Sequence, residues 1–178
     1  MNLKPINPYY KALTRARTLS DDSYPYTWIE PVTDRTQADV DYARELLSKS
    51  WQEFTAEQKL EYLSGLKGSL NRTDLERIEN NIQILLDVLE IDSESYVGAV
   101  PEFPTVTYFA RMRKNVEAIR AGYIVHADTP ATPELPFNTW TKINDIEKIL
   151  ADVYECVSSQ FYYNVGEIYA NDTIGYVL

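Results

Sequence analysis

The side chains best suited to acid–base or nucleophilic chemistry are scarce in this chain. The sequence holds one histidine, His126, and one cysteine, Cys156. A catalytic histidine needs a nucleophile or a carboxylate beside it, and Asp128 is the only candidate nearby in the sequence. We therefore interpret His126 as a surface loop residue. Cys156 has no basic neighbour in sequence that would activate its thiol, so we interpret it as a small buried hydrophobe.

The acidic residues and glycines form no recognisable site either. Glu76 and Glu79 are interpreted as helix caps or as part of a solvated face, because nothing in sequence places them in a cleft. A glycine-rich phosphate loop and an acidic calcium loop are both missing, and a single cysteine cannot build a disulfide or a thiolate zinc site. We predict a protein that is not an enzyme, with no catalytic residues, no cofactor and no bound metal. A cell-wall hydrolase stays open as the enzymatic alternative.

Composition limits the possible partners. The 178 residues include 27 acidic and 17 basic side chains, for a net charge of −10, and 44% of them are hydrophobic. This composition is typical of a globular protein, and the net charge repels nucleic-acid phosphate. No apolar run is long enough to cross a bilayer, and no signal peptide is recognised at the N-terminus. We expect no binding to nucleic acid, no insertion into membranes, and synthesis in the cytoplasm.

The elements that must position any site are helices. Apolar residues recur every three or four positions from residue 33 onward, which predicts a body of about five helices over residues 33–160. Capping boxes are predicted at Thr36 with Asp39, at Thr55 with Gln58 and at Thr73 with Glu76. The fourth and fifth helices are predicted over residues 105–121 and 139–158, joined by a proline-rich loop.

Each predicted helix has an apolar stripe that should face the core. The stripes consist of Val40, Ala43, Leu47 and Trp51; Leu60, Leu63 and Leu66; Leu75, Ile78, Ile82, Leu85 and Leu89; Phe109, Met112, Val116, Ile119 and Tyr123; and Trp140, Ile143, Ile146, Leu150, Val153 and Val157. The basic residues of the fourth helix are expected on its outer face: Arg111, Arg113, Lys114 and Arg120.

The two ends of the chain differ from the body. Residues 1–32 are rich in proline and aromatic residues and predict an extended arm, which packs on its own body or on a neighbouring subunit. Residues 161–178 alternate aromatic and β-branched residues around an Asn-Asp pair, which predicts a small β-hairpin. Aromatic side chains at both ends are the predicted interaction residues: Tyr9, Tyr10, Tyr24, Tyr26, Trp28, Tyr162, Tyr163, Tyr169 and Tyr176.

A short pattern recurs in the third and fourth helices. Residues 77–85 and 111–119 share a basic residue, an apolar residue and then an asparagine, Asn81 in one and Asn115 in the other, at matching positions. Asn144 in the fifth helix repeats the pattern more loosely. An asparagine beside a core stripe predicts a polar contact between packed helices. Whether the pattern is a true duplication or only a shared amphipathic period stays open, and two copies do not make a solenoid.

Several phrases of the sequence resemble a known group of proteins. They are residues 33–40 (TDRTQADV), 66–68 (LKG), 71–82 (NRTDLERIENNI), 135–140 (LPFNTW) and 166–170 (GEIYA). Together they resemble tail-associated structural proteins of phages and prophages of Gram-positive bacteria, over most of residues 25–178. The family often has Asn or Asp followed by Trp before the Arg-Ile-Glu run, whereas this chain has residues 74–76 (DLE) there.

The resemblance implies a non-enzymatic structural component of a phage tail or baseplate, located in the virion. Its expected partners are other virion tail proteins and further copies of itself, contacted through the terminal segments. The alternative is a receptor-binding module whose aromatic residues bind a carbohydrate of the host surface. Both hypotheses involve binding, and they differ in what is bound.

Overall fold

The chain forms helices where apolar side chains recur every three or four residues. The computed structural model describes residues 27–92 and 99–165, with side chains as far as Ser159, and regular structure within these residues is entirely helical. The elements are α2 (Gln37–Leu47), the 3-10 turn η2 (Trp51–Glu53), α3 (Ala56–Ser64), α4 (Arg72–Leu89), α5 (Val106–Gly122) and α6 (Trp140–Val165). The described part therefore confirms the prediction of a mainly α fold with five α-helices.

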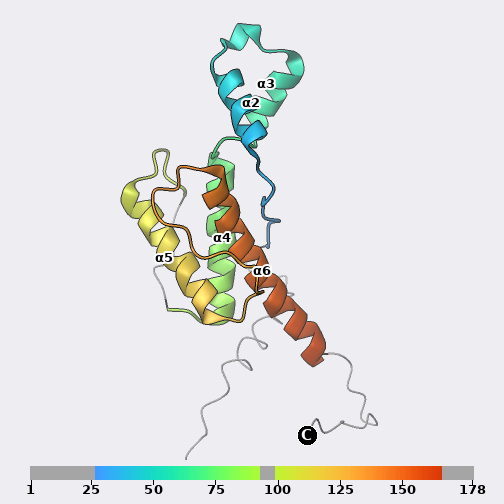
Figure 1. The fold of residues 1–178 in the computed structure, drawn as a ribbon, viewed down its shortest axis with the longest axis vertical. Helices are drawn as coiled ribbons and strands as arrows, with labels where there is room; N and C mark the ends of the chain where they lie inside the picture. Colours follow the sequence, from blue (N-terminus) through green and yellow to red (C-terminus); the bar gives the residue numbers. More distant parts are fainter. Residues whose placement is uncertain (1–26, 93–98, 166–178) are drawn as a thin grey trace, which may run out of the picture.

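These helices are distributed between two parts of the molecule. Figure 1 shows α4, α5 and α6 packed together, and α2 and α3 projecting from one end of that group. We call residues 36–70 the lobe and the three packed helices, with their connections, the body. The chain crosses between the two parts just before α2 and just before α4.

The body contains the large core. Each of its helices contacts the other two. The predicted stripes supply most of the buried side chains: Leu75, Ile78, Ile82 and Leu85 from α4; Met112, Val116 and Ile119 from α5; and Ile143, Ile146, Leu150, Val153 and Val157 from α6. The predicted stripe positions Leu89, Phe109 and Tyr123 are partly buried against this cluster. Periodicity was sufficient here because three long helices cover one another's apolar faces.

The lobe has a much smaller core, and part of the predicted burial there is wrong. Four apolar side chains are buried in it: Ala43, Leu46, Phe54 and Leu66. Leu47 and Trp51, predicted to face a core, are exposed, and Leu60 and Leu63 of α3 are 71% and 72% exposed.

Aromatic packing explains the exposed leucines of α3. The rings of Trp51, Phe54 and Tyr62 contact one another with centroids 5.5–5.9 Å apart. These rings lie on the side of α3 that faces the rest of the lobe. On the same side, Tyr42 Oη of α2 donates to Glu61 Oε2 of α3 (2.7 Å). Helix α3 has only nine residues, and the side that carries Tyr62 packs on the lobe. The side that carries Leu60 and Leu63 is therefore left facing solvent.

Helix starts follow the predicted capping boxes in the lobe but not in the body. Thr36 with Asp39 and Thr55 with Gln58 cap α2 and α3 as predicted. The box predicted at Thr73 and Glu76 is wrong, because α4 begins at Arg72 and its N-cap is Asn71. Asp74 occupies the third position instead and its Oδ2 accepts from the Asn71 backbone N–H (2.9 Å).

Helix α6 is longer than predicted. It continues to Val165, so residues 159–165 extend the helix that was predicted to end at residue 158. Residues 166–178 lie outside the described part, where the hairpin prediction is not tested. No helix in the described ranges has both the length and the apolar character that a membrane crossing demands.

Three of the four basic residues of α5 bind other parts of the body, which corrects their predicted placement on the outer face, whereas Lys114 is exposed as predicted. Arg120 Nε donates to the Pro130 carbonyl (2.7 Å), and Arg113 Nε donates to the Pro133 carbonyl (3.1 Å). These bonds hold the proline-rich connection that returns along the body to the start of α6 (Figure 1). Arg111 forms an ion pair with Glu79 of α4, which is buried and not part of a solvated face.

Candidate interaction surfaces

One predicted interaction residue, Trp28, lies within the described side chains, and it packs on the chain's own body. Its ring stacks on Tyr154 of α6 with the centroids 3.8 Å apart and the planes 8° from parallel. The side chains of the other eight predicted residues are not among those described: Tyr9, Tyr10, Tyr24, Tyr26, Tyr162, Tyr163, Tyr169 and Tyr176. For its last residues, 27–32, the arm is extended and docks in cis.

Asparagines of α4 hold this end of the arm. Asn81 Oδ1 accepts from the Ile29 backbone N–H (3.1 Å), and its Nδ2 donates to the Ile29 carbonyl (2.6 Å). Asn80 Nδ2 donates to the carbonyl of Thr27 (2.8 Å). A side-chain amide thus satisfies a backbone donor and acceptor together, as a neighbouring strand would. The contact predicted between helices at Asn81 is in fact a contact between a helix and the arm.

A buried cluster of four charges joins the same segment to α4 and α6. Arg35 lies just before α2, Asp74 and Arg77 lie on α4, and Glu147 lies on α6. The side chain of Glu147 is 1% exposed. Arg35 Nη2 lies 2.9 Å from both Asp74 Oδ1 and Glu147 Oε1, and Arg77 Nη2 lies 2.6 and 2.8 Å from the same two oxygens. Two positive and two negative groups compensate one another inside the protein, so the burial of each charge is offset by its partners.

Backbone groups complete this four-charge cluster. Glu147 Oε2 accepts from the backbone N–H of Val32 (2.8 Å), and Arg35 Nη1 donates to the carbonyl of Val32 (2.6 Å). Asn144 Nδ2 donates to the carbonyl of Arg35 (2.9 Å). The cluster therefore fixes the path by which the chain enters the lobe.

Burial and hydrogen bonding act in opposite directions on Asp74. Burial alone would raise the pKa of its carboxyl group, but the backbone N–H of Asn71 and the guanidinium groups of Arg77 and Arg35 outweigh that effect, so the pKa lies below its ordinary value. For Arg77, burial opposes the charge while Glu147 and Asp74 favour it, and the net result is a raised pKa. These shifts keep the Asp74–Arg77 pair charged at neutral pH.

Sequence reasoning did not identify this cluster. Glu147 follows the stripe residue Ile146, and Arg77 precedes the stripe residue Ile78, so each charge adjoins a core position. That placement was the available signal, because a charged side chain at the border of an apolar stripe is commonly buried with a partner.

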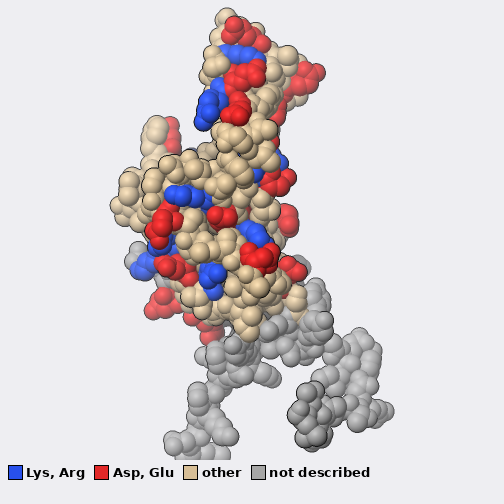
Figure 2. All heavy atoms as spheres, in the orientation of Figure 1, with Lys and Arg blue, Asp and Glu red and all other residues tan. Residues whose placement is uncertain are grey.

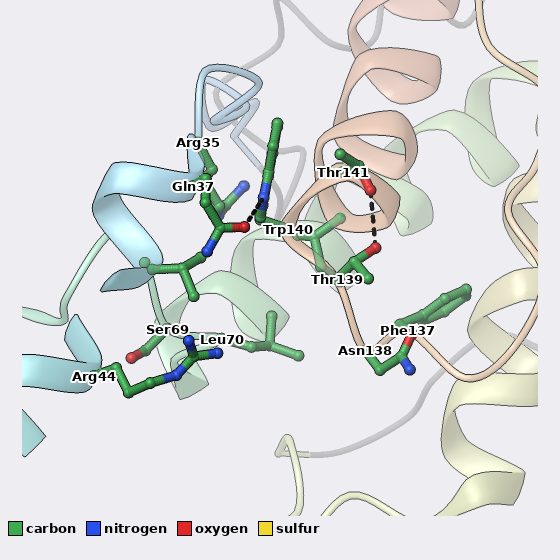
Figure 3. A pocket seen from close by; sticks show the side chains of 13 residues that line it. Arg35, Gln37, Arg44, Ser69, Leu70, Phe137, Asn138, Thr139, Trp140 and Thr141 are labelled. Atoms are coloured by element: carbon green, nitrogen blue, oxygen red, sulfur yellow. Dashed lines mark hydrogen bonds between the residues drawn. The ribbon is translucent and has the colours of Figure 1, made fainter. Parts of the chain in front are cut away.

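A cavity of about 500 Å³ lies where the lobe meets the body. Figure 3 shows side chains from α2, from the connection before α4, and from the start of α6 and the residues before it, including Arg44, Ser69, Leu70, Asn138 and Thr141. Trp140 Nε1 donates to Gln37 Oε1 across the junction (3.2 Å). The cavity thus combines an indole ring with amide, hydroxyl and guanidinium groups.

The structure brings His126 and Cys156 together. His126 Nε2 lies 3.6 Å from Cys156 Sγ and 3.6 Å from Glu155 Oε2, whereas Asp128, the only candidate partner nearby in the sequence, pairs with Lys148 (3.3 Å). Burial, helped by the negative charges of Glu155 and Asp152, raises the pKa of the Cys156 thiol. A raised pKa disfavours the thiolate form of Cys156.

Charge on the molecular surface is mixed. Figure 2 shows basic and acidic side chains interspersed over the face of the body in view, with no field of one sign. Within the described ranges, no group of three His, Cys, Asp or Glu side chains is placed to hold a metal ion.

Exposed large apolar side chains concentrate on the lobe. Among the described side chains, seven of the eleven that are exposed belong to residues 36–70: Tyr42, Leu47, Trp51, Leu60, Tyr62, Leu63 and Leu70. Ala56, Leu60 and Leu63 share one side of α3, which we call the α3 outer face. Such a concentration is typical of a protein-binding surface.

Comparisons with protein-family models, with curated proteins and with solved structures found no match for this chain.

Proposed function

We propose that this protein is a non-enzymatic structural component of a bacteriophage tail or baseplate, and that it assembles in the virion through its terminal segments. The observation that carries the proposal is the exposed apolar surface of the lobe, which stands apart from a well-packed helical body. The polar groups of the described body support the same interpretation, since its buried charges hold chain segments together.

The anchored end of the arm defines where assembly contacts begin. Trp28 and Ile29 belong to the body, because the first stacks on Tyr154 and the second is bound by Asn81. Residues 1–26 are therefore the portion of the arm that is available to other subunits under this proposal. They carry four of the nine predicted interaction residues, namely Tyr9, Tyr10, Tyr24 and Tyr26.

The test is co-assembly with the tail proteins encoded beside this gene. The full chain and a variant lacking residues 1–26 are each co-expressed with those proteins, and the recovered complexes are weighed. We expect the full chain to enter a complex and the shortened chain to stay out of it while keeping its helical circular dichroism. Equal incorporation of both chains, or the absence of tail genes from the neighbourhood, would contradict the proposal.

A second function has one observation in its favour. The junction cavity presents Trp140 beside Gln37, Asn138 and Thr141, and an aromatic face with amide and hydroxyl groups is the combination that binds sugars. In this alternative the protein is a receptor-binding module for a host-surface carbohydrate. A glycan array distinguishes the two, because hits that disappear in Trp140→Ala support the module, and an array without hits excludes it in favour of assembly.

A further inference from the structure

The α3 outer face has no partner within the described part of the chain. Leu60 and Leu63 are 71% and 72% exposed, although a helix with only three large apolar residues would be expected to bury them. The charged residues beside this face on the same helix have opposite signs, Glu57 and Lys59, whereas Glu61 is on the side that faces the lobe, where it accepts from Tyr42 Oη. The face itself therefore suits an apolar ligand.

Charge distinguishes the two terminal segments as candidate ligands. The lobe has six acidic and four basic side chains, for a net charge of −2. Residues 166–178 contain Glu167 and Asp172 and no basic residue, so they also carry −2. Residues 1–26 contain four basic and two acidic side chains, for a net charge of +2, together with apolar residues such as Leu13 and Leu19. Only the N-terminal segment complements the lobe.

The length of the C-terminal segment, residues 166–178, also argues against it as the ligand of the α3 outer face in the same molecule. Helix α6 starts at the junction cavity and runs away from the lobe over 26 residues, a length of about 39 Å (Figure 1). Residues 166–178 extend over at most about 45 Å when fully stretched. Returning along α6 would use nearly all of that length and leave none to cover α3.

The anchored end of the arm favours a second molecule. Residues 27–35 are fixed on the body at Ile29, Val32 and Arg35, and they run toward the lobe. Thr27, the first described residue, is therefore at the end of this path that lies farther from the lobe. Binding in cis would require the segment to reverse direction, whereas a neighbouring molecule can receive it without a reversal.

We propose that residues 1–26 of one copy dock on the α3 outer face of a second copy. This inference rests on the proposed function and names the receiving surface for the arm. The donor segment and the receiving face are different parts of the chain, so the contact is heterologous, and each copy can bind one neighbour at each of the two sites. The resulting assembly is a ring when the rotation between copies closes and a filament when it does not.

The test is the self-association of the purified full-length chain by sedimentation velocity over a range of concentrations. The face variant is Leu60→Glu with Leu63→Glu, and the arm variant lacks residues 1–26. We expect association of the wild-type chain to weaken about 100-fold or more in either variant, because burial of the two leucines supplies most of the contact. A matched control, Phe103→Glu with Val106→Glu, changes two residues that are each 80% exposed on the body and should associate as wild type does.

Mixing the two variants gives the sharpest result. The face variant still has an arm and the arm variant still has a face, so an equimolar mixture should form a 1:1 complex that neither forms alone. A variant lacking residues 166–178 should associate normally. A monomeric wild-type chain, a mixture that does not combine, or loss of association without residues 166–178 would each overturn the inference.

These outcomes are separable from those of the proposed function. Co-assembly with tail proteins by a chain that does not associate with itself would refute the docking of a second copy and leave the structural role intact. Self-association through the arm and α3, without any binding to tail proteins, would support the docking and refute the structural role.

Discussion

At the scale of single residues, Glu147 joins three chain segments through one carboxylate. Its oxygens contact Arg35, Arg77 and the Val32 backbone N–H within 2.9 Å. Removing one partner from a buried ion pair leaves an uncompensated charge, which costs far more than losing an exposed pair. Replacing this carboxylate therefore destabilises the fold mainly because two buried arginines lose a negative partner.

We expect Glu147→Gln to lower the free energy of unfolding by about 3 to 5 kcal/mol, since Arg35 and Arg77 would keep their charges with Asp74 as the remaining carboxylate. Urea denaturation measures the change. Glu76→Gln is the matched control, because Glu76 pairs with Arg72 on the surface and should cost less than about 1 kcal/mol. Equal effects of the two substitutions would show that the buried cluster contributes no more than a surface pair.

Asp74 makes the stability depend on acid. The pKa of Asp74 is lower in the folded state than in the unfolded state, so the folded protein binds this proton less readily. The stabilisation by Asp74 is therefore complete above the unfolded pKa of about 3.9. It is lost as the pH falls through the folded-state pKa. We expect the melting temperature to drop as the pH falls below about 4. In Asp74→Asn, the protein should be less stable at pH 7 and the drop should be smaller.

Asp145 provides a contrast of opposite sign. Burial raises the pKa of its carboxyl group, so ionisation of Asp145 disfavours the folded state as the pH rises. Asp145→Asn should therefore leave the acid-induced drop at least as steep as in the wild type. If Asp145→Asn flattens the drop as Asp74→Asn does, the acid response does not come from Asp74.

At the scale of elements, the lobe depends on a close approach between α2 and the connection before α4. A Cβ atom added at Gly68 would lie 2.0 Å from the backbone oxygen of Asp39, which belongs to the first turn of α2. No side chain fits at that distance, and a backbone atom cannot move aside as a flexible side chain does. Gly68 is thus required by packing between two segments.

We expect Gly68→Ala to displace α2 and to destabilise the lobe by about 1 to 3 kcal/mol, the usual cost of overpacking. Fluorescence of Trp51, which packs on Phe54 in the lobe, would report the change during urea denaturation. Ser69→Ala, one residue further along, is the control and should behave as wild type. An unchanged Gly68→Ala protein would show that α2 and this connection are not in the contact described.

Periodicity predicted the elements of the body well and those of the lobe poorly. Most stripe residues of α4, α5 and α6 are buried as predicted because three long helices cover one another, whereas Trp140 lies at the junction cavity. In the lobe the same kind of pattern failed for Leu47, Trp51, Leu60 and Leu63, because a helix pattern shows which side is apolar but not whether another element covers that side.

At the scale of the whole molecule, the two cores differ in size and should differ in stability. The lobe buries four apolar side chains, whereas the body core has eighteen. Local opening requires less free energy where fewer apolar contacts are broken. We expect amide hydrogens of α3 to exchange through openings of lower free energy than those in the middle of α4, as measured by native-state hydrogen exchange. Equal opening free energies would indicate that lobe and body unfold as one unit.

The candidate surfaces were only partly predictable at this scale. Aromatic content pointed to the arm, and Trp28 does make a contact, but with Tyr154 of the same chain. The junction cavity combines residues from three regions that are distant in sequence, among them Gln37, Ser69 and Trp140, so no local pattern could indicate it. The exposed leucines of α3 were predicted as core residues and are now the main evidence for a binding surface.

The amino-acid sequence alone determines that the described part of the chain is helical, where most of its helices begin, and which side chains of the body are apolar, since caps and periodicity are local properties. The partners of its polar groups depend on the tertiary structure. Arg35, Asp74, Arg77 and Glu147 come together from three segments, and Asn81 binds the backbone of a residue 52 positions away. Burial is likewise a property of the neighbours that fold over a residue, which is why the leucines of α3 are apolar by sequence and exposed by structure.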